Sequence, residues 1–515
     1  MVTPDVCRDQ GFYDLAIDVD PADANRVVLG GSFLAFTTPE NVALSGEAAI
    51  VVAHVAANAG ALRYGVPGQP FAMLGVGVHA DVQGVYFSNG GARLWACTDG
   101  GVFRSDRPQD GAAAAAPTCA GFYPRNNGLQ VVEANYVAHN PRCEGYVAAG
   151  LQDNASIMAR STSVWVRVPN MSGDGGGILP RPLHPQHWIG QFTRAIWRSS
   201  DSVLVRRSLF TRAGGVSTNE NGDSAFYSTA AGLATTRPAG AVPTHQVGQV
   251  LIGTTRLWYT EETRPLGAAL PTSLGLNWFT LPTGTDPLPG DANAGLREKR
   301  DDFGEAITVC RWQDRNVAWV LGEGKLMRYA RVPGSDDGGP PGTWSRETII
   351  QKDSASSRRR EDPLRASAVW TDIAVNLDPP AAANQPPLQH GTKGALYLGN
   401  IGKPGDTAVD TLWWYDGTGK WFKTGLRTDA AGVPAPVLAI VCDPLFPEEV
   451  YVGTTVGVWR GLRTQIGNAD PAWTWSKRLN GLPEAAVHDL AIFNDNQIRL
   501  LRAAIAARGV WELRL

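Results

Sequence analysis

The chain has 515 residues with 46 basic and 49 acidic side chains, which gives a net charge of −3. Because the two signs are well mixed, the sequence excludes the basic surface expected of a nucleic-acid-binding protein. The 58 Gly and 35 Pro are too numerous for a helical protein and favour many tight turns, while a hydrophobic content of 43% supports a large packed core.

The N-terminus and the cysteines indicate where the protein is located and which kinds of site it lacks. Met1 to Arg8 contains neither the basic nor the apolar region of a signal peptide. No run of about 18 apolar residues occurs, so the sequence predicts no membrane span. We therefore expect a cytoplasmic chain, a chain exported by another route, or a piece of a longer protein. The six Cys show no Cys-x-x-Cys or Cys/His metal spacing.

One pattern of short strands recurs along the whole chain. An Asp-Leu-apolar strand leads through a turn to an apolar strand that ends in Gly, and an aromatic strand follows. We count nine copies, which start near Tyr13, His79, Ala134, Gly177, Ala225, Glu305, Val369, Val437 and Val487. In chain order their clearest strands cover residues 13–17 and 27–31, 94–97 and 101–105, 145–150 and 164–168, 187–190 and 195–199, 250–253 and 257–259, 317–322, 395–399, 450–453 and 457–460, and 499–503 and 509–513.

This repeat predicts an all-β fold, a single closed β-propeller over residues 1–515 with eight or nine four-stranded blades. The last copy offers only three strands, so Val2 to Cys7 is the candidate to complete and close the terminal blade. Asp14, Asp372 and Asp489 recur at the start of the first strand, which indicates a structural role. Trp459 and Trp511 follow Gly-Val pairs inside apolar strands, and we expect both to be buried core anchors.

Two strings resemble a known family. His79-Ala-Asp-Val-Gln83, followed by Thr98-Asp-Gly-Gly-Val-Phe-Arg-Ser105, resembles the bacterial neuraminidase-type (Asp-box) repeat propellers. That superfamily includes sortilin-type receptor domains, xyloglucanase-type glycoside hydrolases and photosystem assembly factors. The resemblance implies a sialidase-like propeller fold over nearly the whole chain. Only remnants of the Asp-box survive, and the Arg-Ile-Pro string of true sialidases is absent, which argues against sialidase activity. The paired catalytic Asp of the xyloglucanase-type enzymes matches no position.

Polar residues at the strand ends of neighbouring repeats form the candidate ligand-binding site. They are His79, Asp81, Asp99, Gln152, Asp153, Asn154 and Asp174. Equivalent positions of successive blades lie around one channel mouth, so we expect these residues to converge there. Carboxylates in such a funnel suit acid–base work or a hard cation, and Ca²⁺ is the one cofactor that the pattern allows. The alternative is that each Asp or Asn caps its own turn.

Other candidates have structural explanations. Trp413, Trp414 and Tyr415, with Trp421 nearby, resemble a carbohydrate-stacking platform, but alternation along a strand would send neighbouring rings to opposite faces and favours core packing. His184 and His187 flank a turn without carboxylate neighbours in the sequence, and we interpret them as surface residues.

The sequence favours a non-catalytic binding or scaffold propeller that recognises a protein or a glycan at its channel face, with no nucleic-acid partner and no membrane span. The alternative is an enzyme, a glycoside hydrolase or lyase that acts on a polysaccharide with channel-facing Asp residues.

Overall fold

The computed structural model describes residues 6–7, 10–37, 43–55, 62–64, 72–73, 75, 78–106, 122–129, 131–161, 164–168, 173–192, 195–199, 205–206, 229–239, 242–254, 257–265, 279–281, 307–322, 325–332, 342–351, 369–376, 394–402, 409–428, 432–465, 470–478, 481–495 and 497–515. All the regular elements of these residues are β-strands, so the all-β prediction is confirmed. The described residues include no helix with the length and apolar character needed to cross a membrane. The chain forms two compact units, Met1–Val132 and Glu133–Leu515.

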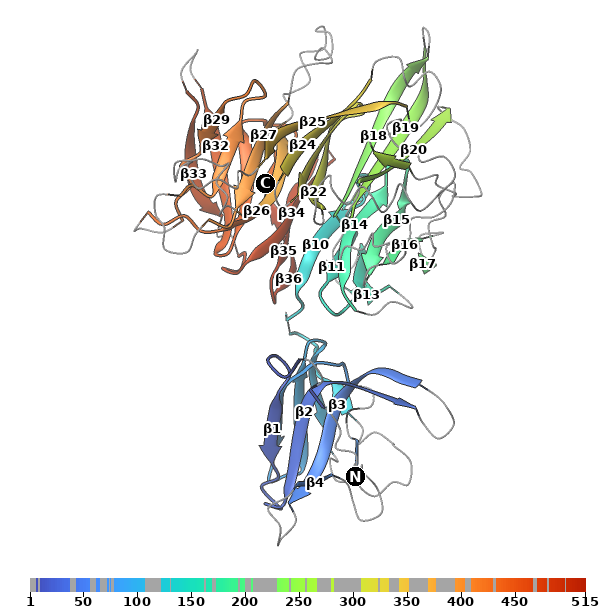
Figure 1. Cartoon of the computed structure of the whole chain (residues 1–515), viewed down its shortest axis with the longest axis vertical. Coiled ribbons are helices and arrows are strands. Elements are labelled where there is room, and N and C mark those ends of the chain that lie inside the picture. The colour runs from blue at the N-terminus through green and yellow to red at the C-terminus, as the bar shows by residue number, and fades with distance from the viewer. Residues whose placement is uncertain are drawn as a thin grey trace. The chain divides into compact units, whose positions relative to one another are not determined.

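The first unit contains two antiparallel sheets (Figure 1). Their inner strands contact each other, and apolar residues from both sheets, with Phe87 and Phe122 among the largest, form one core. The strands are β1 (Ala16–Val19), β2 (Arg26–Thr37), β3 (Ala43–Val55), β4 (Leu62–Tyr64) and β5 (Ala72–Met73) in one sheet, and β6 (Val82–Ser88), β7 (Arg93–Thr98), β8 (Gly101–Ser105) and β9 (Phe122–Pro124) in the other.

The second unit contains seven antiparallel sheets, each with its strands in sequence order. The first three comprise β10 (Ala134–His139), β11 (Tyr146–Leu151), β12 (Ser156–Arg160) and β13 (Trp165–Arg167); β14 (Gly175–Arg181), β15 (His184–Phe192), β16 (Ala195–Ser199) and β17 (Val205–Arg206); and β18 (Thr229–Ala239), β19 (Val242–Gly253), β20 (Leu257–Pro265) and β21 (Phe279–Leu281).

Three more four-stranded sheets and one three-stranded sheet complete the second unit. They comprise β22 (Ile307–Asp314), β23 (Val317–Gly322), β24 (Lys325–Arg331) and β25 (Trp344–Gln351); β26 (Trp370–Asn376), β27 (Ala395–Asn400), β28 (Leu412–Tyr415) and β29 (Trp421–Lys423); β30 (Val437–Cys442), β31 (Glu449–Thr454), β32 (Gly457–Thr464) and β33 (Ala472–Arg478); and β34 (Val487–Asn494), β35 (Arg499–Ile505) and β36 (Gly509–Arg514).

The first strands of these seven sheets contact one another in a circuit. β10, β14, β18, β22, β26, β30 and β34 each contact the next, and β34 also contacts β10. Separate apolar cores fill the spaces between consecutive sheets, as the face-to-face stacking of strands buried on both faces requires. Between the last and first sheets, the rings of His139 and Phe493 meet edge to face with centroids 5.4 Å apart. Stacked four-stranded sheets in this order are the architecture of a β-propeller.

A β-bulge recurs near the start of the inner strand. The register shifts there in β6, β10, β14, β22, β26, β30 and β34. In β34, for example, the shift falls between Val487 and Asp489. A bulge adds an unpaired residue and re-aims the side chains beside it, so the same local geometry opens the inner strand in seven of the nine sheets.

The glycines that end several second strands allow close packing of consecutive sheets. A Cβ on Gly253 would lie 2.5 Å from Ile307, and one on Gly399 would lie 2.6 Å from Val437. In each case the neighbour is the first residue of the next inner strand. The close backbone approach that the repeat predicts is therefore present.

The nine repeat copies correspond to the nine sheets of the described residues, and each copy begins within a few residues of an inner strand. Seven of these sheets form the circuit, whereas the sequence predicted eight or nine blades in one ring. Repeat counting finds sheets but does not show which sheets share a ring. That the two units form the single domain predicted for residues 1–515 stays a prediction.

The predicted closure by the N-terminus falls largely on residues 1–5, which lie outside the described residues. The Val6 carbonyl accepts a hydrogen bond of 2.8 Å from the Ser32 amide of the first unit. The last sheet has three strands among the described residues, and its completion by Val2 to Cys7 stays a prediction.

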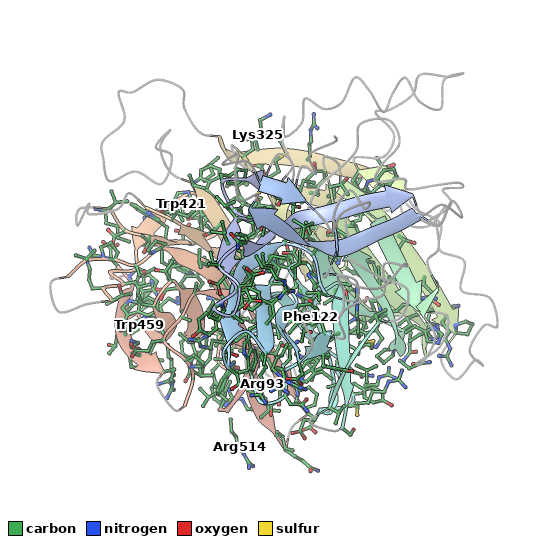
Figure 2. The ribbon with its side chains drawn as sticks, turned by 90° about the horizontal axis from the view of Figure 1, so that it is seen from below. Arg93, Phe122, Lys325, Trp421, Trp459 and Arg514 are labelled. Atoms are coloured by element: carbon green, nitrogen blue, oxygen red, sulfur yellow. The ribbon has the colours of Figure 1, made fainter. Side chains whose placement is uncertain are left out.

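The predicted tryptophan anchors differ in burial. Trp413, Trp414 and Tyr415 are buried in the cores, which confirms the core interpretation and leaves no stacking platform there. Trp459 (Figure 2) and Trp511 pack against the cores but are only partly buried, so the prediction that both are buried core anchors holds in part.

Candidate functional site

A cavity of about 720 Å³ lies where the inner strands of the second unit meet. All seven inner strands of this unit contribute to its lining. Its polar side chains include Asn135, Gln152, Arg311, Thr371, Asp372, His488 and Asp489. We call this cavity the channel.

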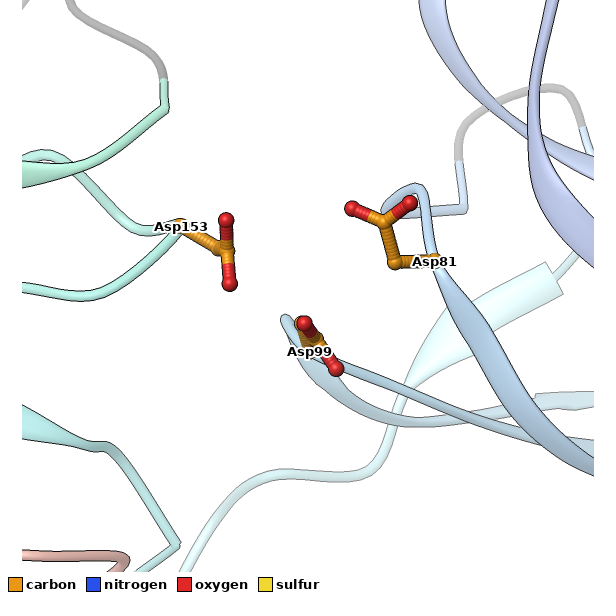
Figure 3. A group of neighbouring side chains, drawn as sticks. All are labelled: Asp81, Asp99 and Asp153. Atoms are coloured by element: carbon orange, nitrogen blue, oxygen red, sulfur yellow. The ribbon is translucent and has the colours of Figure 1, made fainter. Parts of the chain in front are cut away.

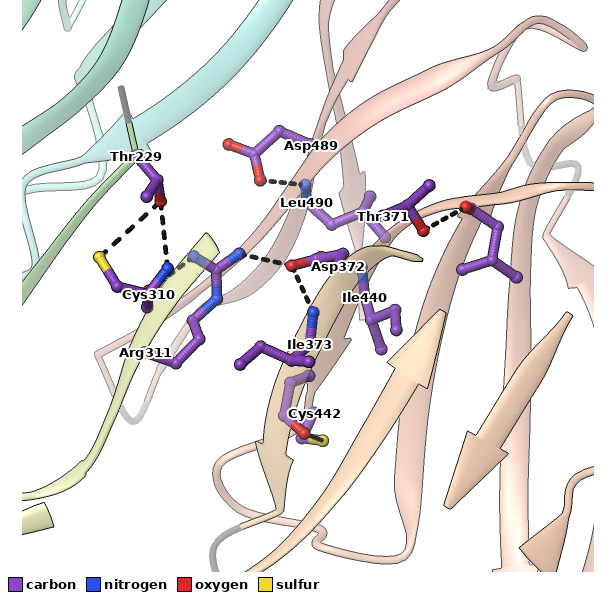
Figure 4. Close-up of polar contacts among 12 residues, drawn as sticks. Thr229, Cys310, Arg311, Thr371, Asp372, Ile373, Ile440, Cys442, Asp489 and Leu490 are labelled. Carbon is purple, nitrogen blue, oxygen red and sulfur yellow. Dashed lines mark hydrogen bonds and ion pairs between the residues drawn. The ribbon is translucent and has the colours of Figure 1, made fainter. Parts of the chain in front are cut away.

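Asp372 joins two inner strands at the channel wall (Figure 4). Its Oδ1 accepts a hydrogen bond of 2.8 Å from the Ile373 amide, and its Oδ2 accepts one of 2.6 Å from the Ile440 amide. The first amide belongs to β26 and the second to β30 of the next sheet. Both carboxylate oxygens are therefore engaged by backbone, and the side chain is 4% exposed.

Asp489 repeats this arrangement at the junction of the last and first sheets. Its Oδ1 accepts a hydrogen bond from the Leu490 amide, and its Oδ2 accepts one from the Val137 amide of β10, both at 2.9 Å. The recurrent Asp therefore has the structural role predicted from the sequence at these two positions. Asp14 differs, because its Oδ1 accepts a hydrogen bond from the Gln83 side chain.

Arg311 projects from β22 and supplies positive charge to the channel. Its guanidinium donates to Asp372 Oδ1 at 3.1 Å, and its side chain is 30% exposed. Burial alone would lower the pKa of Arg311, but the negative charges of Asp372 and Asp489 outweigh burial and raise it. Arg311 therefore stays cationic and presents donors to the channel.

Burial has the opposite effect on the two carboxyls. It raises the pKa of Asp489 to about 7, although Arg311 and the Val137 amide favour the charged form. It also raises the pKa of Asp372, where Arg311 and the amides of Ile373 and Ile440 oppose the rise. The channel thus holds a fixed cation beside two carboxyls whose ionisation is resisted by their surroundings.

His488 adds a further polar group to the wall. Its Nδ1 lies 2.9 Å from Asn135 Oδ1, and burial lowers its pKa, partly opposed by Glu133. At neutral pH the channel therefore offers a neutral imidazole, the Asn135 and Gln152 amides and the Arg311 guanidinium. These groups can form hydrogen bonds to a polar ligand. They differ from the pair of free carboxylates that a glycoside hydrolase uses.

Three of the predicted site residues belong to the first unit. Asp81 and Asp99 stand on neighbouring turns, with carboxylate oxygens within 4.8 Å of each other (Figure 3). Asp99 accepts hydrogen bonds from Tyr13 and Gln83, and Asp81 accepts one from Ser32. The structure thus brings Asp81 and Asp99 together.

His79, the third of these residues, has its Nδ1 3.1 Å from the neighbouring Ala80 carbonyl oxygen.

The other four predicted residues belong to one turn region of the second unit. Asp174 is buried, and its Oδ1 accepts a hydrogen bond of 3.1 Å from the Asp153 amide. The Asn154 side chain donates to the Gln152 carbonyl at 3.0 Å. These contacts support turn capping for Asp174 and Asn154, while Gln152 also lines the channel.

The candidate aspartates are divided between the two units, so their predicted convergence around one channel stays a prediction.

The histidine interpretation was wrong for His184. This side chain is fully buried, and its Nε2 lies 2.7 Å from Glu262 Oε1. Arg181 donates to the other oxygen of the same carboxylate. Glu262 lies far along the chain on β20, so the sequence around His184 could not reveal this carboxylate neighbour.

Sequence reasoning missed Arg311 and His488 as channel residues. The available signal was a single Arg inside the otherwise apolar first strand of a repeat, in Thr308-Val-Cys-Arg311-Trp. A charge at a position that should be buried indicates either a buried partner or a cavity. For His488 the signal was its place directly before the recurrent Asp489.

Comparisons with known proteins give distant matches. No family model matches the chain, and no curated protein is significantly similar to it. Similar solved structures include the extracellular domain of a hybrid two-component system from B. thetaiotaomicron, with TM-score 0.38 and 11% identity. The WD40 β-propeller domain of Doa1 has TM-score 0.38 and 10% identity, and the GH74 xyloglucanase from Xanthomonas campestris has TM-score 0.33 and 14% identity.

The matched regions cover 75%, 74% and 85% of this chain. They span 38% of the two-component domain, 92% of the Doa1 domain and 57% of the xyloglucanase. Membership of the Asp-box family stays a prediction. With TM-scores this low, the architecture rests on the sheet order and the circuit of inner strands, and these identify the second unit as a β-propeller.

Proposed function

We propose that this chain is a non-catalytic binding protein whose second unit takes a protein segment or a glycan at its channel. The observation that carries the proposal is the state of the channel carboxylates. Asp372 and Asp489 each accept backbone hydrogen bonds on both oxygens. Carboxylates committed in this way support the ring and are poorly placed to protonate or attack a substrate.

Arg311, His488 and Asn135 supply the recognition groups in this proposal. A cavity of about 720 Å³ has the size of a small-ligand pocket. It can also receive a few residues of a peptide or one or two sugar units that project from a larger partner. The guanidinium favours a ligand that presents carboxylate, carbonyl or hydroxyl oxygens.

A polysaccharide and peptide panel tests the proposal on the full chain. We expect retention of a ligand without release of reducing sugar, and weaker retention by the Arg311→Gln variant. Arg346→Gln is the matched control, because Arg346 is exposed on β25 and does not line the channel. Binding that is equal in both variants would place recognition elsewhere.

A glycoside hydrolase or lyase is the second candidate, and one observation favours it. The pKa of Asp489, raised to about 7, suits proton transfer near neutral pH. Release of sugar from any panel member, lost in the Asp489→Asn variant with the fold intact by circular dichroism, would establish this activity in place of simple binding.

We also propose that the second unit is a complete propeller of seven blades. The circuit of inner strands and the Asp489 bond to β10 support this closure. Residues 133–515 expressed alone should then unfold in one cooperative transition. A broad or absent transition would show that the ring depends on the first unit.

A further inference from the structure

Three carboxylates of the first unit lie at the ends of neighbouring strands. Asp14 precedes β1, Asp81 precedes β6, and Asp99 lies in the turn between β7 and β8. The Gln83 side-chain amide donates to Asp14 Oδ1 at 3.0 Å and to Asp99 Oδ1 at 3.2 Å, so one group bridges two of the carboxylates. Oxygens of Asp81 and Asp99 also lie within 4.8 Å of each other (Figure 3).

The hydrogen bonds of this cluster leave one buried oxygen, Asp14 Oδ2, without a donor among the described residues. Tyr13 donates to Asp99, and Ser32 donates to Asp81 Oδ1 at 3.0 Å. Asp14 is 0% exposed, and its Oδ2 is buried without a hydrogen-bond partner among the described residues. Burying a carboxylate oxygen without a donor or a counter-charge is unfavourable, because the oxygen loses its hydration and gains nothing in exchange.

No described Lys, Arg or His forms an ion pair with Asp14 or Asp81. Asp14 lies close enough to Asp81 and Asp99 for their negative charges to act on it. Like charges at this range repel unless a proton or a cation lies between them. A proton or a cation held between Asp14 and Asp81 would therefore relieve this repulsion.

We infer that Asp14, Asp81 and Asp99 of the first unit bind a hard divalent cation, of which Ca²⁺ is the representative. The donor set consists of carboxylate oxygens with hydroxyl and amide groups around them, and hard cations prefer oxygen ligands. Neither Cys nor His belongs to the set, which disfavours zinc. The orphaned Asp14 Oδ2 is the ligand atom that the sequence pattern alone did not indicate. This inference is independent of the channel and of the proposed function.

Calorimetric titration of the chelator-treated full chain with Ca²⁺ tests the site. We expect one saturable binding event, with the affinity reduced at least about tenfold in Asp14→Asn and in Asp81→Asn. The matched control is Asp23→Asn in the same unit, where the exposed Asp23 only caps a local turn. The control should bind Ca²⁺ as the parent does.

Terbium luminescence gives a second readout that does not depend on the stability of the variants. Because Tyr13 donates directly to Asp99, it should sensitise Tb³⁺ bound at this cluster. Emission should be displaced by Ca²⁺ and should fall in Tyr13→Phe. Absence of Ca²⁺ heat and of displaceable emission would overturn the inference. So would an Asp14→Asn variant that is more stable than the parent and binds Ca²⁺ equally well, since the cluster would then hold a shared proton.

Discussion

Gly453 and Val487 are in such close contact that a Cβ on the glycine would lie 2.7 Å from Val487 Cγ1. Gly453 is near the end of β31, and Val487 opens the inner strand of the next sheet, where it is fully buried. The pair therefore sets how closely the last two sheets of the second unit stack.

Replacing this glycine should separate the two sheets. Gly453→Ala should lower the free energy of unfolding by about 1–3 kcal/mol, because overpacking forces the backbone to shift. The added Val487→Ala change should recover part of the loss by making room for the methyl group. Urea unfolding of the four members of the double-mutant cycle measures this coupling. Additive losses would show that the two residues do not constrain each other.

Asp372 and Asp489 each accept hydrogen bonds from two backbone amides, so removing either carboxylate should lower the stability of the fold. Asp372→Ala orphans the Ile373 and Ile440 amides and leaves Arg311 without its ion pair. Each unsatisfied buried group costs about 1–3 kcal/mol, so the variant should be clearly destabilised in urea. Asp470→Ala, which removes an exposed aspartate of the same unit, is the control. Equal midpoints for the two variants would contradict the role.

The acidic cluster of the first unit predicts a pH dependence without cations. The Asp14 pKa is about 7 in the folded chain against an ordinary value of 3.8. Between these values the folded state binds more protons than the unfolded state, so stability falls as pH rises through this window. Asp14→Asn cannot ionise and should flatten the slope, although Asp489 keeps part of it. Melting curves from pH 4 to 8 with chelator, at about equal ionic strength, measure the difference. Parallel slopes would exclude Asp14 as the source.

Fully buried and partly buried tryptophans should differ in how much they contribute to the free energy of unfolding. Trp319 is fully buried and its indole N–H donates to Gln313 at 3.0 Å, so Trp319→Ala should cost about 3–5 kcal/mol. Trp511 is only partly buried, and Trp511→Ala should cost less than that range. Chemical denaturation of both variants gives the comparison, and a larger loss at Trp511 would reverse the assignment of the anchors.

The sheets could be predicted from the sequence because each sheet is built from strands that follow one another along the chain. The Gly at positions such as 399 and 453 and the apolar runs before them mark strands that pair with their sequence neighbours. The ring is different, since β34 meets β10 across more than three hundred residues. No local pattern encodes that contact, so a repeat count alone does not tell which sheets share one circuit.

The candidate site was predicted in part for the same reason. Asp81 and Asp99 flank one pair of strands, and their proximity follows from local geometry. Asp14 joins them through packing of β1 on β6, and it looked structural because Asp372 and Asp489 share its place in the repeat. Position in a repeat fixes the backbone, but the partners that surround each copy decide whether its carboxylate supports a strand or remains available.

The recurrent bulge at the start of the inner strands divides positions that must keep the cores packed from positions that only face the channel. Beyond the bulge, the alternation of side chains is tied to the cores between sheets, and most changes there disturb packing. Before and at the bulge, residues such as Asn135 and His488 face the channel without filling those cores. Their identities can drift without loss of the ring, so the same scaffold can acquire a new ligand by a few substitutions at strand openings while its architecture stays unchanged.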